Sequence, residues 1–150
     1  MSDGSAILIP SLVLSRTYDA PVERVYAAWT DPKILQKFLG PGSVKATDIE
    51  TDVRVGGKYR VVMLMDDGER MVATGVYREV QVPSRLVMTW RWEEENPSNE
   101  HDTLLTLEFF DRGGKTELVL THENFAAADS RERHEHGWND ALDKLGRSLQ

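Results

Sequence analysis

The stretch from Ser130 to Gln150 constrains the fold of this chain more than any other. Its apolar residues recur at intervals of four, three and four, the period of one face of an α-helix, at Trp138, Leu142, Leu145 and Leu149. His134 lies one turn earlier on the same face. We expect Asp129 to cap this helix together with Glu132. Gly137 costs about 1 kcal/mol relative to alanine inside a helix, so we expect another element to approach the backbone there.

The segments before this helix predict one strand, two short helices and about six further strands. The first strand covers Ser11–Tyr18. The short helices begin near Pro21 and at Asp31, which we expect to cap the second helix. Strands separated by short turns follow over residues 44–122, which is typical of an antiparallel meander, and Arg85–Glu95 alternates most regularly. The long helix is the element able to cover one face of such a sheet, which indicates an α+β domain.

The composition limits the number of domains and the kinds of partner. The chain has 150 residues without a shift in composition, so we expect one domain over residues 11–150 after a lead-in over residues 1–10. A formal net charge of -7 argues against nucleic acid or an anionic membrane as a partner. The lack of cysteine excludes disulfides and thiolate chemistry. Neither a signal peptide nor an apolar run of about 20 residues is present, so we expect a cytoplasmic protein.

Five segments, in this order and spacing, carry a resemblance to a known family: Ala20–Pro32, Val55–Tyr59, Pro83–Trp90, Thr116–His122 and His134–Trp138. Together they make the chain similar to the activator of heat-shock-protein-90 ATPase homology family, within the START-like (SRPBCC) superfamily. The resemblance covers residues 12–149, nearly the whole chain. It implies a helix-grip fold, in which a curved antiparallel sheet of about six to seven strands surrounds a long C-terminal helix, with two short helices after the first strand and a cavity between sheet and helix.

The chain departs from the family pattern in three respects. Phe38 stands where members commonly carry tryptophan, at the expected mouth of the cavity, and Asn124 stands where glycine is frequent. Asparagine tolerates the left-handed backbone conformation, so the second change is mild. The eukaryotic co-chaperone of the family has an additional N-terminal domain, and no segment here resembles it. We therefore expect the family name to imply little about heat-shock protein 90 for this chain.

The expected cavity between sheet and helix supplies the candidate site. Apolar side chains from the predicted strands and helices would face it, and a large apolar pocket with few polar groups suits a hydrophobic or amphipathic ligand. The predicted ligand-contacting residues are Trp29, Phe38, Met63, Met88, Trp90, Trp92, Leu107, Phe109, Leu120, His122, His134, Trp138 and Leu142. Each of them could instead simply fill a core.

His122 and His134 are the polar groups that we expect to face this interior. They could orient a ligand or transfer a proton, or they could be structural histidines bonded to their surroundings. We expect no metal site, because His134 and His136 are two residues apart and point in different directions on a helix. We also expect no cofactor and no catalytic residue.

Three functions remain open at this point. The first is binding of a hydrophobic or amphipathic small molecule without catalysis. The second is a co-chaperone-like interaction module for a heat-shock-protein-90 homologue, which the family name suggests. The third is a START-like cyclase or hydrolase, which would need a polar cavity with paired titratable groups. A monomer and a homodimer, paired through exposed sheet edges, are both compatible with the sequence.

Overall fold

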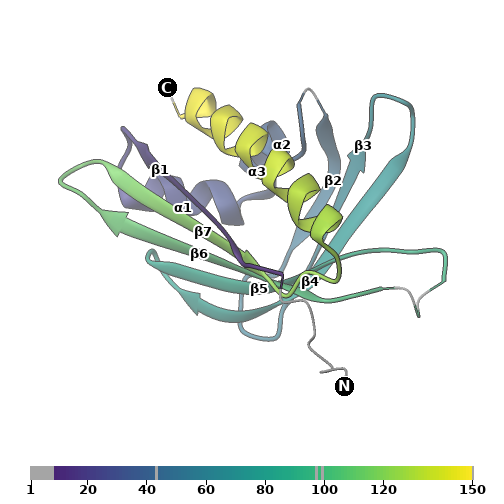
Figure 1. Ribbon diagram of the computed structural model, residues 1–150. Helices are drawn as coiled ribbons and strands as arrows, with labels where there is room; N and C mark the ends of the chain where they lie inside the picture. The colour runs from purple at the N-terminus through teal and green to yellow at the C-terminus, as the bar shows by residue number, and fades with distance from the viewer. Residues whose placement is uncertain (1–8, 43, 97, 99, 150) are drawn as a thin grey trace, which may run out of the picture.

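The residues that the computed structural model describes, 9–42, 44–96, 98 and 100–149, form one seven-stranded antiparallel sheet and three helices (Figure 1). In chain order the elements are β1 (Leu12–Tyr18), α1 (Val22–Thr30), α2 (Pro32–Phe38), β2 (Lys45–Thr51), β3 (Lys58–Leu64), β4 (Arg70–Gln81), β5 (Arg85–Trp92), β6 (Thr103–Asp111), β7 (Thr116–Glu123) and α3 (Ala128–Ser148). The predicted helix-grip fold of the α+β class is confirmed.

The sheet is a meander from β2 to β7 that is extended by the first strand. Its strand order is β1-β7-β6-β5-β4-β3-β2. The regular alternation that predicts β5 belongs to the central strand, where Leu86, Met88 and Trp90 are all buried. β1 lies beside β7, with Leu12 opposite His122 and Tyr18 opposite Thr116.

Helix α3 lies across the concave face of the curved sheet (Figure 1). The residues from Trp138 onward make the helix part of the core, since Ala141, Leu142 and Leu145 are each at most 1% exposed. The Tyr18 hydroxyl on β1 donates a hydrogen bond of 2.8 Å to the Leu142 carbonyl. The C-terminal half of α3 is therefore fixed to the sheet by apolar burial and by this bond.

The two short helices pack against both α3 and the sheet. Asp31 begins α2 as predicted, and its side chain accepts a hydrogen bond of 2.9 Å from the Lys33 amide. On α1, the Trp29 ring lies 6.0 Å from the Trp138 ring of α3, and the Tyr26 ring lies 5.4 Å from Phe109 of β6. α1 thus connects the long helix to the sheet.

Two expectations about α3 are wrong. The helix begins at Ala128 after Ala127, without a side-chain hydrogen bond at its cap, so Asp129 and Glu132 form no capping box. Asp129 already lies in the first turn, where its charge still favours the helix dipole. Gly137 meets no close neighbour: a Cβ there would lie 3.9 Å from Pro41 Cβ. The close approach occurs instead at Gly146, where a Cβ would lie 3.3 Å from the Tyr18 ring.

Three further observations concern Asn124, the N-terminal lead-in and membrane-spanning helices. Asn124 has a φ of 70°, the left-handed conformation that asparagine tolerates at this departure from the family pattern. The predicted lead-in over residues 1–10 falls mostly on residues 1–8, which lie outside the described part of the chain. Among the described residues, no helix is long and apolar enough to cross a membrane.

Substitution by alanine should change the free energy of unfolding in opposite directions at two glycines, Gly75 in β4 and Gly137 in α3. In β4, a methyl group at Gly75 would overlap the Thr89 carbonyl oxygen of β5 and the Tyr59 ring, whereas a methyl group at Gly137 makes an ordinary contact. We predict that Gly75→Ala lowers the free energy of unfolding by about 3 kcal/mol. Gly137→Ala should raise it by about 1 kcal/mol through helix propensity. Urea unfolding followed by circular dichroism checks both values, and equal changes would contradict the packing at Gly75.

Candidate functional site

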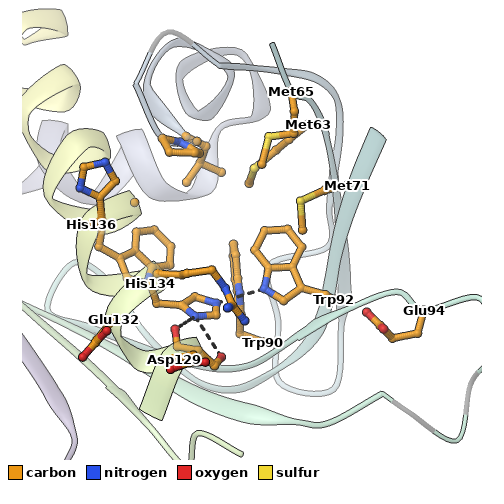
Figure 2. Close-up of a pocket in the computed structure, with 17 residues that line it drawn as sticks. Met63, Met65, Met71, Trp90, Trp92, Glu94, Asp129, Glu132, His134 and His136 are labelled. Atoms are coloured by element: carbon orange, nitrogen blue, oxygen red, sulfur yellow. Dashed lines mark hydrogen bonds between the residues drawn. The ribbon is translucent and has the colours of Figure 1, made fainter. Parts of the chain in front are cut away.

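A pocket of about 750 Å³ opens between the N-terminal half of α3, the turn after α2 and the ends of β3, β4 and β5 (Figure 2). The residues that line it are Leu39, Gly40, Pro41, Met63, Met65, Met71, Trp90, Trp92, Glu94, Asp129, Ser130, Glu132, Arg133, His134, His136, Gly137 and Trp138. The pocket begins where α3 stops packing tightly, because Trp138 is 4% exposed while the helical residues before it are exposed or half-buried.

The inner wall of the pocket is apolar and sulfur-rich. Figure 2 shows Met63, Met65 and Met71, from the β3–β4 hairpin, across the hollow from α3. Trp90 and Trp92 extend from β5 at its base. Methionine is unbranched and polarizable, so this wall can adapt to apolar ligands of different shape.

Charged and polar side chains line the outer part of the pocket. Glu94 belongs to the loop after β5, while Asp129, Glu132, Arg133 and His136 belong to α3, and all are exposed. The charged groups therefore remain in water, whereas Met63 and Trp90 of the apolar wall are buried. This division matches an amphipathic molecule whose polar end stays at the mouth.

His134 is bonded at both ring nitrogens. The Trp92 indole N–H donates to His134 Nε2 over 3.1 Å, and His134 Nδ1 lies 2.7 Å from the Ser130 carbonyl oxygen one turn earlier (Figure 2). This network assigns a neutral imidazole with its proton on Nδ1. Burial is the main cause that lowers the pKa of His134 below the ordinary value for histidine.

His122 lies behind this pair and is fully buried. The Trp138 indole N–H donates to His122 Nδ1 over 3.0 Å. The Thr103 hydroxyl donates to the Trp90 carbonyl over 2.7 Å, so it accepts a hydrogen bond from His122 Nε2 at 2.6 Å. Burial, and secondarily the charge of a protonated His134, lower the pKa of His122 to about 2.

The two histidines therefore act as acceptors that orient tryptophans. Their rings lie 4.8 Å apart, edge to face, and Phe125 packs on both. Since each ring nitrogen is already committed within the protein, neither imidazole offers a free proton donor or acceptor to a ligand. The arrangement favours the structural interpretation of the pair over proton transfer.

A small void of about 20 Å³ lies deeper in the core, beside the pocket. Leu39, Trp90 and Trp138 line both hollows. The remaining residues around the void are Trp29, Leu35, Thr51, Tyr59, Val61, Tyr77, Met88 and Leu105. Its volume is close to that of one water-sized atom.

The structure separates the predicted site residues into three groups. Those that line the pocket are Met63, Trp90, Trp92, His134 and Trp138. Those that line only the void are Trp29 and Met88. Those that line neither hollow are Phe38, Leu107, Phe109, Leu120, His122 and Leu142, which are buried in the core. Contact with a ligand stays a prediction for all of these residues.

Sequence reasoning missed most of the mouth and much of one wall. The sequence predicts Phe38 at the pocket mouth. In the structure, Phe38 packs against Trp29 with ring centres 5.0 Å apart. The residues just after it, Leu39–Pro41, line the pocket instead. The signal for these residues is the Gly-Pro-Gly turn that ends α2. Gly137 was a second signal for the pocket. A glycine inside a helix can mark an open surface as well as a close contact, and here it lines the pocket without a close neighbour.

No cluster of three His, Cys, Asp or Glu side chains able to hold a metal ion occurs in the part of the chain that the structure describes. His136 pairs instead with Asp140 at 3.6 Å, and Asp140 accepts a hydrogen bond of 2.8 Å from the Gly42 amide. The bond from the Gly42 amide to Asp140 connects α3 to the turn after α2, next to the pocket-lining residues Gly40 and Pro41.

The curved sheet, the long covering helix and the hollow between them define a START-like helix-grip protein. The chain belongs to the family of activator of Hsp90 ATPase homolog 1-like proteins, whose model matches residues 19–150. The family predicted from the five sequence segments is thus confirmed.

The relatives differ in length from this chain. It is 27% identical over 128 residues to the human activator of 90 kDa heat shock protein ATPase homolog 1, which covers 85% of this chain and 33% of that protein. It is 30% identical over 116 residues to the mouse homolog 2, covering 76% of this chain and 30% of that protein. The chain therefore spans about a third of the length of the curated relatives it matches.

Solved structures share the whole fold. A protein from Chromobacterium violaceum is 28% identical, covers 93% of this chain and 97% of its own, and superposes with a TM-score of 0.83. The AHSA1 protein of Silicibacter pomeroyi is 24% identical, with the same coverage of both chains and a TM-score of 0.82. The second likeness concerns the fold alone.

The low pKa of His122 makes a prediction about pH and stability. An unfolded histidine titrates near pH 6.5, whereas folded His122 titrates at about 2. Between these values the unfolded chain binds the extra proton, so stability falls as the pH falls, by about 1.4 kcal/mol per pH unit. His122→Asn keeps an acceptor for the Trp138 indole and cannot titrate, so its stability should fall less steeply below pH 6.5. Urea unfolding between pH 7.5 and 5 measures both slopes, and parallel slopes would contradict the assignment.

Proposed function

We propose that this protein binds a hydrophobic or amphipathic small molecule in the pocket between α3 and the sheet, without transforming it. The observation that carries the proposal is the combination of a volume of about 750 Å³, a wall of methionine and tryptophan, and charged lining side chains that are exposed to solvent. Pockets of roughly 300–1,000 Å³ with this division of polarity suit small molecules.

Binding energy would come from burial of the apolar part of the ligand, at about 25 cal/mol per Å². Trp90, Trp92 and Trp138 offer large rigid surfaces that lose little conformational entropy when a ligand arrives. Met63, Met65 and Met71 complete the enclosure on the opposite side. The committed ring nitrogens of His122 and His134 favour binding over acid–base catalysis.

Gly137 offers a way to fill the pocket without touching the core. A leucine there would extend from a position whose nearest neighbour is Pro41 Cβ, itself part of the pocket wall. We predict that Gly137→Leu folds at least as stably as the wild type and loses at least about tenfold in ligand affinity. Gly137→Ala, which adds only a methyl group, is the matched control and should keep most of the affinity.

Native mass spectrometry of freshly purified protein is the measurement. The wild type and Gly137→Ala should carry a small-molecule adduct that Gly137→Leu lacks. A panel of lipids and aromatic compounds, followed by tryptophan fluorescence and melting temperature, supplies a second measurement. The proposal fails if no adduct appears and the panel changes neither signal in the wild type.

A second function is favoured by the likeness to the activators of the 90 kDa heat shock protein ATPase. We propose as the alternative that this domain associates with a heat-shock-protein-90 homologue. The shared segment covers about a third of those relatives, so the alternative rests on this one domain.

The alternative predicts a measurable effect on the chaperone. The purified protein, added in excess to a bacterial heat-shock-protein-90 homologue, should raise its ATPase rate at least about twofold. Gly137→Leu should stimulate equally, because it changes the pocket mouth and leaves the fold intact. The absence of both stimulation and co-sedimentation would remove this alternative.

A further inference from the structure

The position of Trp92 in the pocket wall depends on a hydrogen bond to His134. The Trp92 indole N–H donates to His134 Nε2 over 3.1 Å, and the two ring centres lie 5.9 Å apart (Figure 2). Trp92 is the last residue of β5 and is half-buried, whereas Trp90 on the same strand is 4% exposed and packs against Trp138. The Trp92 ring therefore has less packing to fix it, and the bond to His134 contributes more to its orientation.

His134 can accept this bond only while its ring is neutral. Its Nδ1 lies 2.7 Å from the Ser130 carbonyl oxygen, which can only accept, so the ring proton lies on Nδ1 and Nε2 is the acceptor. A second proton would bind to Nε2 and place an N–H group opposite the Trp92 N–H. Two donors cannot form one hydrogen bond, so the Trp92 ring would have to leave its position when His134 is protonated.

The aromatic groups packed against His134 offer no counter-charge. On β7, the His122 ring lies 4.8 Å away and is fully buried, and on the loop after β7 the Phe125 ring lies 5.3 Å away. His122 stays neutral above about pH 3, because burial lowers its pKa to about 2. The β7 side of His134 is therefore uncharged over the whole physiological range.

The charged groups near His134 lie on α3 and on the loop after β5. Burial, and to a smaller extent the charge of Arg133, lower the pKa of His134, while the bond to the Ser130 carbonyl opposes this effect. Three exposed carboxylates line the same pocket without an ion pair to His134 among the described residues: Glu94, Asp129 and Glu132. The neutral ring is thus the form at pH 7, and its protonation falls on the acidic side of pH 6.5.

We propose that protonation of His134 releases Trp92 from its position in the pocket wall, so that the pocket binds its ligand at neutral pH and releases it at acidic pH. Trp92 and His134 both line the pocket, so the loss of their bond changes its wall directly. The coupling is reciprocal, since a ligand that packs on the bonded Trp92 ring favours the neutral form of His134. This inference rests on the proposed binding function and adds regulation of the same site by pH.

The release of Trp92 is tested without a ligand. In ¹⁵N-labelled wild type, the indole N–H signal of Trp92 is followed from pH 7.5 to 5 together with the imidazole signals of His134. We expect the Trp92 signal to move upfield, toward that of an indole in water, with the same midpoint as His134. The Trp138 signal should keep its position, because its acceptor His122 stays neutral in this range.

Two variants separate His134 from the other histidine of the pocket. His134→Gln keeps an acceptor for the Trp92 N–H and does not titrate, so it should abolish the pH-dependent shift. His136→Gln is the matched control, because the His136 side chain is 80% exposed and pairs with Asp140, and it should leave the shift unchanged. A Trp92 signal that stays in place while His134 titrates overturns the inference, and so does a His134 that remains neutral down to pH 5.

Ligand affinity is measured with N-phenyl-1-naphthylamine, which is uncharged between pH 7.5 and 5. The wild type should bind this probe at least about threefold more weakly at pH 5 than at pH 7.5, and His134→Gln should bind it equally at both. Equal binding by the wild type at both values overturns the regulation of the site, while binding in the pocket stands. If the wild type does not bind the probe at pH 7.5, the binding function loses this support, and the release of Trp92 is still decided by the indole signals.

Discussion

The hydrogen bond from the Trp138 indole to His122 connects the two layers on which the structure depends. Trp138 comes from α3 and His122 from β7, and the bond lies in a fully buried position where an unpaired partner would be costly. Thr103 continues the chain from His122 to the carbonyl of Trp90 on β5. Four consecutive elements, β5, β6, β7 and α3, thus share one polar network, which fixes where α3 crosses the sheet.

That crossing point divides the long helix into two parts. Beyond Trp138, Ala141, Leu142 and Leu145 are buried against the sheet and stabilise the fold. Before it, the helix is exposed or half-buried and forms one side of the pocket. The same amphipathic stripe therefore closes a core at one end and borders a hollow at the other. Gly137 stands at the boundary and keeps the pocket side open, since a larger side chain there would extend toward Pro41.

The tryptophans have different roles that depend on their N–H groups. Trp92 and Trp138 donate to histidines held neutral by burial, so their rings have fixed positions. Trp29 and Trp90 hold their donors in the core without an acceptor in the described residues.

The order of the elements, the antiparallel meander, the long C-terminal helix and the family all follow from the sequence alone, because they depend on local periodicity, turn residues and spaced segments. The sequence also supplies Met63, Trp90, Trp92, His134 and Trp138 as candidates that the structure places on the pocket wall. The folded arrangement was needed to show that β1 pairs with β7, that the core excludes Phe38 and Leu142 from the pocket, and that Gly137 opens a surface. Such outcomes depend on which residues from distant elements meet, and a periodic pattern states only which face of its own element a residue occupies.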